Sequence, residues 1–278
     1  MEHVLCYSCG SNTARDYASE NGYTLVKCNH CGLLYVNPRP NVDEIEQAHT
    51  LGQHRGADMI QTTGYYDFSK VSSYIQTLKE IFGDGRILKG KRWLDIGCGY
   101  GEFLEALNKF SSNGVIAKGT EPNVRKAAAA RKNGLDVDYF DLAAHKDKYD
   151  YISMLNVYSH LPDPPAIISE WKKLLLPGGQ LILETGNTAD LSKEQHPQPF
   201  YLPDHLSFAS EKIVTTILER IGFDVLSVRK YAEVRETPMA ILREALKVLV
   251  PGKKSKLWRV IRRDMKYIDM YVHARLKP

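Results

Sequence analysis

The sequence lacks any long apolar run. No segment approaches the about 18–20 apolar residues that a membrane-spanning helix needs, and the residues after Met1 lack the apolar stretch of a secretory signal. Glycine and proline together are 33 of 278 residues and 43% of the chain is hydrophobic, which excludes collagen-like and disordered classes. We therefore expect a cytoplasmic globular protein with one catalytic domain and an accessory module.

The chain also has little net charge, +4 at pH 7, but this charge is unevenly distributed. Residues 251–278 carry nine Lys or Arg against two Asp, a formal +7, which leaves −3 on residues 1–250. A body without excess positive charge does not favour nucleic acid as a partner. We expect the basic C-terminal segment to contact an anionic partner or another subunit.

Cysteine is scarce, and its spacing argues for a metal rather than for disulfides. Four of the five cysteines form two Cys-x2-Cys pairs separated by 18 residues, which is typical of a four-thiolate zinc site. Four thiolates complete the coordination of Zn²⁺, so the expected ion is structural. So small a module needs the metal to fold. We predict a zinc ribbon over residues 1–38 with the ligands Cys6, Cys9, Cys28 and Cys31.

Residues 39–90 are expected to form a helical linker or lid. A turn-rich Asn-Pro-Arg-Pro-Asn segment at 37–41 ends the ribbon. Apolar residues with helical spacing follow at 43–49 and 71–82, on either side of a polar, glycine-rich stretch at 52–64. This segment therefore leads from the ribbon into the main domain.

From residue 91 the pattern alternates between strands and helices, which is typical of a parallel sheet covered on both faces. The expected strands lie at 92–96, 115–120, 135–140, 149–155, 180–185 and 223–229. The expected helices lie at 101–110, 123–133, 164–176 and 210–221. We predict an α/β domain with a Rossmann-like sheet over 91–232, and a C-terminal segment, 233–278, in which a helical insertion precedes a closing strand at 269–275.

A glycine-rich loop joins the first of these strands to its helix. The segment Asp95-Ile-Gly97-Cys-Gly99-Tyr-Gly101 lets backbone amides approach a ligand closely at a helix start. A dinucleotide-binding fold would place its third glycine at position 102, which is Glu102 here. The loop instead resembles the first motif of class I S-adenosylmethionine-dependent methyltransferases.

The resemblance extends to the ends of the next three strands. Glu121 stands where such enzymes bind the ribose hydroxyls, and Asp141-Leu142 where they hold the adenine. The segment 156–164 resembles the family's Glu-His-Leu-x-Asp-Pro signature. The resemblance implies S-adenosylmethionine as cofactor, bound by Asp95, Gly97, Gly99, Gly101, Glu121, Asp141, Leu142 and Asn156.

A narrower resemblance covers almost the whole chain. The ribbon ends in Cys-x2-Cys-Gly-Leu-x-Tyr-Val-Asn-Pro-x-Pro, and Pro-Asp-His-Leu-Ser-Phe follows at 203–208. These segments resemble the zinc-ribbon methyltransferases of sugar and envelope-polysaccharide pathways. The resemblance implies a sugar or glycan acceptor, either linked to a nucleotide or part of a polymer.

Methyl transfer to a hydroxyl or a carbon acid needs in-line positioning and a base. His205 and His160 are the candidate bases, because both are expected near the carboxyl edge of the sheet and a neutral imidazole can accept a proton near pH 7. Tyr158 is a weaker candidate at the same edge. Each histidine has a structural alternative, as a residue that only holds its loop.

Two other functions fit the same motifs. A zinc-ribbon methyltransferase of ribosomal RNA would need basic residues on the ribbon, where the sequence offers few. A cofactor-binding scaffold that has lost its chemistry is disfavoured by the intact Asp95, Glu121 and both loop histidines. We therefore expect an enzyme that methylates a sugar.

Overall fold

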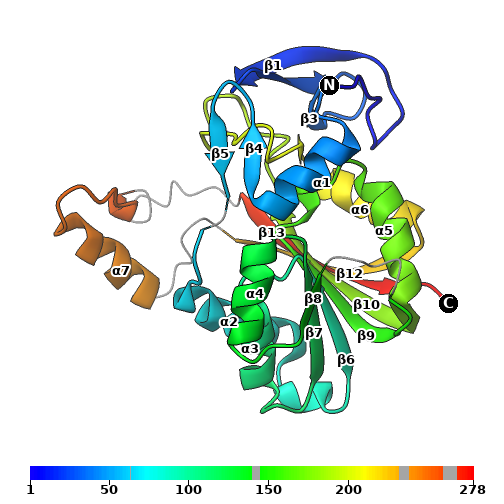
Figure 1. The fold of residues 1–278 in the computed structure, drawn as a ribbon, viewed down its shortest axis with the longest axis vertical. Coiled ribbons are helices and arrows are strands. Elements are labelled where there is room, and N and C mark those ends of the chain that lie inside the picture. Colours follow the sequence, from blue (N-terminus) through cyan, green and yellow to red (C-terminus); the bar gives the residue numbers. More distant parts are fainter. Residues whose placement is uncertain (63, 140–144, 232–237, 259–267) are drawn as a thin grey trace.

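The computed structural model describes residues 1–278 except 63, 140–144, 232–237 and 259–267. A seven-stranded sheet with the order β12-β13-β10-β9-β6-β7-β8 forms its centre (Figure 1). Strands β10, β9, β6, β7 and β8 pair in parallel, whereas β13 runs antiparallel to both β10 and β12. The strands are β6 (Arg92–Ile96), β7 (Ile116–Glu121), β8 (Val137–Tyr139), β9 (Tyr149–Leu155), β10 (Leu175–Gly186), β12 (Phe223–Tyr231) and β13 (Asp269–Leu276).

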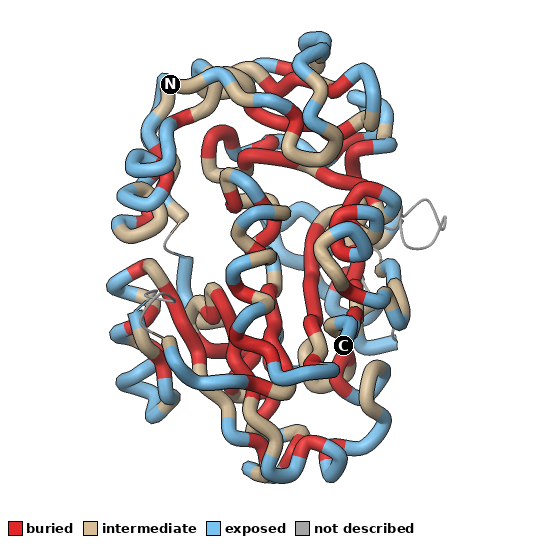
Figure 2. Tube along the Cα trace, turned by 90° about the vertical axis from the view of Figure 1, so that its right-hand side faces the viewer, coloured by how far each residue is buried: buried red, intermediate tan, exposed pale blue. Residues whose placement is uncertain are grey.

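Alternation along the strands gives the sheet two apolar faces, because neighbouring side chains point to opposite sides. Trp93 and Ile182 pack with helices α2, α3 and α4, whereas Leu94 and Leu183 pack with α5 and α6. Buried residues follow the strands through the molecule (Figure 2). The helices are α2 (Phe68–Phe82), α3 (Glu102–Phe110), α4 (Val124–Lys132), α5 (Pro164–Trp171) and α6 (Glu211–Arg220), with short 3-10 turns at Gly85–Leu88, Tyr158–His160 and Lys172–Leu174.

The ribbon is a second sheet, with the antiparallel order β1-β2-β3-β11. Its strands are β1 (Ala14–Glu20), β2 (Tyr23–Cys28), β3 (Leu34–Val36) and β11 (Ser207–Phe208). Strand β11 comes from a much later part of the sequence than the other three strands. Its pairing of Ser207 with Tyr35 attaches the ribbon to the main domain. The predicted ribbon therefore incorporates a segment that sequence analysis placed in the methyltransferase domain.

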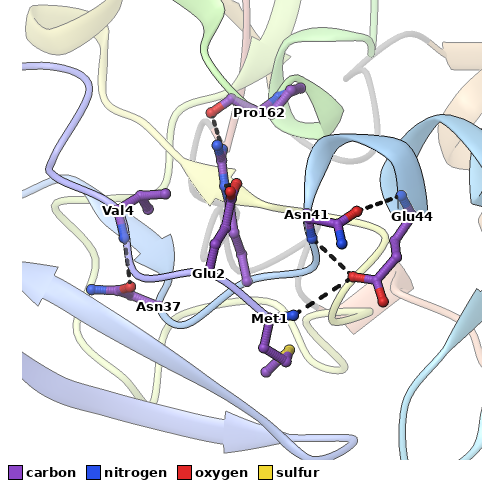
Figure 3. Close-up of polar contacts among 8 residues, drawn as sticks. Met1, Glu2, Val4, Asn37, Asn41, Glu44 and Pro162 are labelled. Atoms are coloured by element: carbon purple, nitrogen blue, oxygen red, sulfur yellow. Dashed lines mark hydrogen bonds and ion pairs between the residues drawn. The ribbon is translucent and has the colours of Figure 1, made fainter.

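Polar contacts attach the N-terminus to the same assembly (Figure 3). The Val4 amide donates to the Asn37 side chain, and the Met1 ammonium lies 3.8 Å from Glu44. Glu44 in turn completes a capping box with Asn41 at the start of α1 (Val42–Leu51). Arg39 donates to the carbonyl of Pro162 in the loop before α5. The ribbon, α1 and the sheet are thus joined by direct contacts.

The predicted Rossmann-like fold is confirmed, including the closing strand, which is β13. The expectation for 39–90 differs in one respect, because α1 is followed by a hairpin of β4 (Gln53–Arg55) and β5 (Met59–Gln61). Gly52 adopts φ 66°, a left-handed conformation that turns the chain back after α1. In the C-terminal segment, α7 (Pro238–Val248) lies within the predicted helical insertion, of which the structure describes residues 238–258.

Candidate cofactor and acceptor site

The glycine loop follows β6 and leads directly into α3. Gly97, Gly99 and Gly101 have φ values of 71°, 58° and 88°, which glycine adopts without a steric penalty. A Cβ atom on Gly97 would lie 2.6 Å from the Cγ2 atom of Val157. Glycine at position 97 therefore lets the loop pack closely against Val157, while the amides of Gly97 and Gly101 donate to the carbonyls of Thr120 and Cys98.

Asp95 lies beneath this loop and is 2% exposed. The Ser153 hydroxyl donates to its carboxyl at 2.6 Å, and the Trp93 indole donates to the same hydroxyl at 2.9 Å. Burial raises the pKa of Asp95 to about 8, and the neighbouring carboxylates, among them Glu121, add to the rise. The sheet therefore holds a buried acidic group, which is unfavourable to ionise, at the edge where the glycine loop begins.

Glu121 ends β7, the strand beside β6. Its carboxylate accepts the Gly99 amide at 2.8 Å and the Asn123 amide at 2.9 Å. Burial raises its pKa, although these two amides oppose the rise. The structure thus brings Asp95, Glu121 and the glycine loop together, as the sequence predicts for a cofactor site.

Asn156 follows β9 with φ 58°, and its side-chain amide donates to Glu184 at 3.1 Å. Glu184 also accepts the Tyr231 hydroxyl from β12. Asn156 is thus an exposed residue at the same edge, bonded to the buried Glu184. Of the predicted cofactor residues, Asp141 and Leu142 lie outside the described residues.

Four histidines and one aspartate gather beside this edge. His160 Nδ1 and His54 Nε2 each lie 3.1 Å from Oδ1 of Asp204. The His205 ring lies 4.8 Å from His160, and the His49 ring lies 5.5 Å from His54. The sequence does not identify His49, His54 and Asp204 as site residues, because no local motif connects positions so far apart in the chain.

The cluster adjoins the proposed cofactor residues. The Asn123 side chain donates to the His49 carbonyl at 3.3 Å, and the amide of the same Asn123 donates to Glu121. His160 belongs to the turn that follows β9 shortly after Asn156. A group held by the histidines would therefore lie close to a ligand held by the glycine loop.

The two predicted bases differ in environment. Burial lowers the pKa of His160, but Asp204 outweighs this effect, so the pKa is raised overall. Burial and the neighbouring His160 lower the pKa of His205 to about 4. The Nδ1–H of His205 donates to the Phe200 carbonyl at 2.9 Å, which leaves a lone pair on Nε2.

Tyr158 lies away from this cluster. Its side chain is 1% exposed and belongs to the core between the ribbon and the sheet, where its ring lies 6.4 Å from Tyr7. Burial raises the pKa of its hydroxyl well above the usual value. The structure gives Tyr158 a packing position, in contrast to the edge position that the sequence predicts.

The four ribbon cysteines converge. Their sulfurs lie within 4.8 Å of one another, with Cys6 Sγ at 3.5 Å from Cys31 and Cys9 Sγ at 3.6 Å from Cys28. Burial raises the pKa of the Cys6 thiol. This arrangement has the donor set and the spacing that tetrahedral zinc requires.

Within the described part of the chain, no helix combines the length and the apolar character needed to cross a membrane.

Curated relatives match part of the chain. A ubiquinone biosynthesis O-methyltransferase of Actinobacillus pleuropneumoniae is 37% identical over 111 residues, which are 36% of this chain and 47% of that protein. The enzyme of the same name from Pseudomonas aeruginosa is 34% identical over 110 residues, 36% of this chain and 46% of that protein. The chain thus spans about half the length of the curated relatives it matches.

These relatives overturn the predicted sugar or glycan acceptor, which is wrong. The prediction depended on the ribbon ending and on residues 203–208. In the structure Leu33, Leu34, Tyr35 and Val36 are buried, and Ser207 and Phe208 pair with β3. The ribbon ending, Ser207 and Phe208 therefore reflect how the ribbon packs, which does not identify an acceptor.

Solved structures share the fold. An S-adenosylmethionine-dependent methyltransferase of Mesorhizobium loti has a TM-score of 0.51 at 15% identity and covers 72% of this chain and 96% of its own. One from Archaeoglobus fulgidus has a TM-score of 0.50 at 22% identity and covers 74% of this chain and 94% of its own. A family model described as a methyltransferase domain matches residues 66–228, more than half of the chain. The chain therefore belongs to this family and is a class I S-adenosylmethionine-dependent methyltransferase.

Proposed function

We propose that this enzyme transfers the methyl group of S-adenosylmethionine to a hydroxyl oxygen of a small quinone-type molecule. The names of the curated relatives support O-methylation in ubiquinone biosynthesis. The observation that carries the proposal is the histidine cluster beside the glycine loop, because a hydroxyl must lose its proton as its oxygen is methylated. A quinone must be in its reduced, hydroxylated form to present such an oxygen.

The proposed cofactor residues divide the task by chemistry. The Glu121 carboxylate, which also accepts the Gly99 amide, suits the ribose hydroxyls of S-adenosylmethionine, and the Gly97–Gly101 loop lies beside it. Asp95 and Asn156 line the same edge. Asp141 and Leu142 stay proposed as adenine contacts. The cofactor supplies an electrophilic methyl group on a positively charged sulfur, which buried carboxylates favour electrostatically.

His205 is the proposed base. Since Nδ1–H donates to the Phe200 carbonyl, Nε2 is the atom free to take the hydroxyl proton. His160, held by Asp204, packs beside that ring and orients it. Most of the rate enhancement would then come from holding the hydroxyl oxygen in line with the methyl group while Nε2 removes its proton.

The ribbon is proposed to hold one structural Zn²⁺ through Cys6, Cys9, Cys28 and Cys31. The four converging sulfurs support this, since packed thiols without a metal bring no comparable stabilisation. Two basic side chains of the ribbon strands are already engaged: Arg15 donates to Asn29, and Lys27 donates to the Ala189 carbonyl. Because these two basic side chains are bonded within the protein, they support a ribbon that stabilises the main domain over a ribbon that binds RNA.

The proposal predicts label transfer to a hydroxyl. Purified enzyme with methyl-labelled S-adenosylmethionine is expected to convert hydroxylated, reduced quinone precursors into methyl ethers, identified by mass spectrometry. The oxidised quinones, which lack the hydroxyl, serve as matched controls and are expected to stay unlabelled. Label found on bulk RNA and on no hydroxylated precursor would contradict the proposal.

Substitution His205→Gln is expected to lower kcat by about 10²-fold or more, the usual contribution of a general base. The Kd of S-adenosylmethionine, measured by calorimetry, should change only a few-fold because His205 lies outside the glycine loop. His30→Gln, at an exposed histidine of the ribbon, is the control and should retain full activity. A normal kcat in His205→Gln would reject the role.

Substitution Asp95→Asn tests the buried carboxyl. The folded-state pKa of about 8 is above the unfolded value of about 3.9, so its contribution to stability is full below the unfolded value. This contribution is lost as pH rises toward 8, at up to about 1.4 kcal/mol per pH unit. The variant without cofactor should therefore show a flatter dependence of Tm on pH between 5 and 8, yet bind S-adenosylmethionine at least tenfold more weakly. Unchanged affinity would exclude Asp95 from the cofactor site.

Substitution Cys28→Ser is expected to lose one zinc per chain, measured by mass spectrometry of the metal, and to lower Tm. Turnover should fall with it, because β3 of the ribbon pairs with the strand that follows His205. Cys98→Ser, at the cysteine outside the ribbon, is the control for metal content. Retention of the wild-type metal content in Cys28→Ser would count against the zinc site.

A further inference from the structure

His49, His54 and Asp204 form a second group of potential metal ligands, which the proposed base does not use. His49 lies in the last turn of α1 and His54 in the middle of β4. The left-handed turn at Gly52 folds β4 back against α1 and brings the two rings together. Asp204 reaches them from the loop before β11, more than 140 residues later.

The ligand atoms of these three residues converge. One ligand atom from each residue lies within 4.8 Å of the other two, and His54 Nε2 lies 3.1 Å from Oδ1 of Asp204. This short approach does not have hydrogen-bond geometry. Among the described residues, neither His49 Nε2 nor His54 Nε2 has a hydrogen-bond partner, although both atoms are buried. His54 is only 3% exposed.

Such an arrangement is costly unless something is bound. A buried polar atom without a hydrogen-bond partner destabilises the fold, and His49 and His54, which converge with Asp204, each hold one such nitrogen. Two imidazoles and one carboxylate are a ligand set that zinc and iron enzymes use, with further positions open to water or substrate. Imidazole and carboxylate donors also differ chemically from the four thiolates of the ribbon.

We propose that His49, His54 and Asp204 bind a divalent transition-metal ion beside the acceptor site. The position supports a role in the reaction, because Asp204 also contacts His160 and because Asn123 connects His49 to Glu121. This inference rests on the proposed function for its role: a metal there would bind the acceptor hydroxyl and favour its ionisation, with His205 taking the proton. The binding of the metal itself is independent of the acceptor.

Metal counting tests the site without any acceptor. The full chain, loaded with Co²⁺ and freed of excess metal, is expected to bind two ions. The ribbon ion should give intense thiolate charge-transfer bands in the near ultraviolet, and the second ion weaker visible bands typical of nitrogen and oxygen ligands. His54→Gln and the double variant His49→Gln/His54→Gln should each lose one ion and the weaker bands.

The thiolate bands serve as the internal control for folding, and they should persist in both variants. His196→Gln replaces another buried histidine, outside the cluster, and should retain two ions. A wild-type chain that gives only the thiolate bands, or a double variant that keeps both sets of bands and two ions, would overturn the site. If the histidine variants lose the thiolate bands as well, Asp204→Asn is measured instead and is expected to lose one ion. Retention of both ions in Asp204→Asn would overturn the proposal.

The outcomes also separate this site from the proposed function. Two bound ions together with no methyl transfer to any hydroxylated precursor would sustain the metal site and reject the acceptor class. One bound ion that gives only the thiolate bands, together with methyl transfer, would reject the metal site and leave O-methylation in place.

Discussion

The loop that carries Asp204 and His205 is held by backbone hydrogen bonds from two sides, and the candidate active site depends on them. On the ribbon side, the Glu20 carboxylate accepts the amides of Phe200 and Leu202, and the Val36 amide donates to the Leu206 carbonyl. On the sheet side, the Leu206 amide donates to the Ser159 carbonyl at 2.7 Å. The proposed base and the proposed metal ligand are therefore positioned between the ribbon and the turn after β9.

This arrangement gives the ribbon a physical reason to be part of the enzyme. Its strands contribute no histidine to the cluster, but they fix the loop that does. If zinc folds the ribbon, the ion also determines where His205 lies, through β3 and β11. A structural metal would then affect catalysis indirectly, through backbone geometry rather than through contact with the substrate.

The other half of the site is an accumulation of buried acid. Four acidic side chains at this edge are each at most 7% exposed: Asp95, Glu102, Glu121 and Glu184. Repulsion from the other three carboxylates adds to burial in raising the pKa of Asp95. Such a cluster destabilises the protein when the site lacks a cation. A positively charged sulfur bound above the glycine loop would relieve this repulsion. Attraction to the buried carboxylates would therefore contribute to the affinity for the cofactor.

The sequence by itself determined the sheet, the glycine loop and the cysteine spacing, because each is a local pattern. Alternation in β6 and β10 fixed which side chains face each helical layer, and Gly97 and Gly101 required left-handed backbone. Tertiary structure alone decided the histidine cluster, since His54 and Asp204 meet only when β11 joins the ribbon sheet. It also decided that Tyr158 is a core residue. The acceptor was mispredicted because the ribbon ending and residues 207–208, which pack the ribbon, carry little information about a substrate.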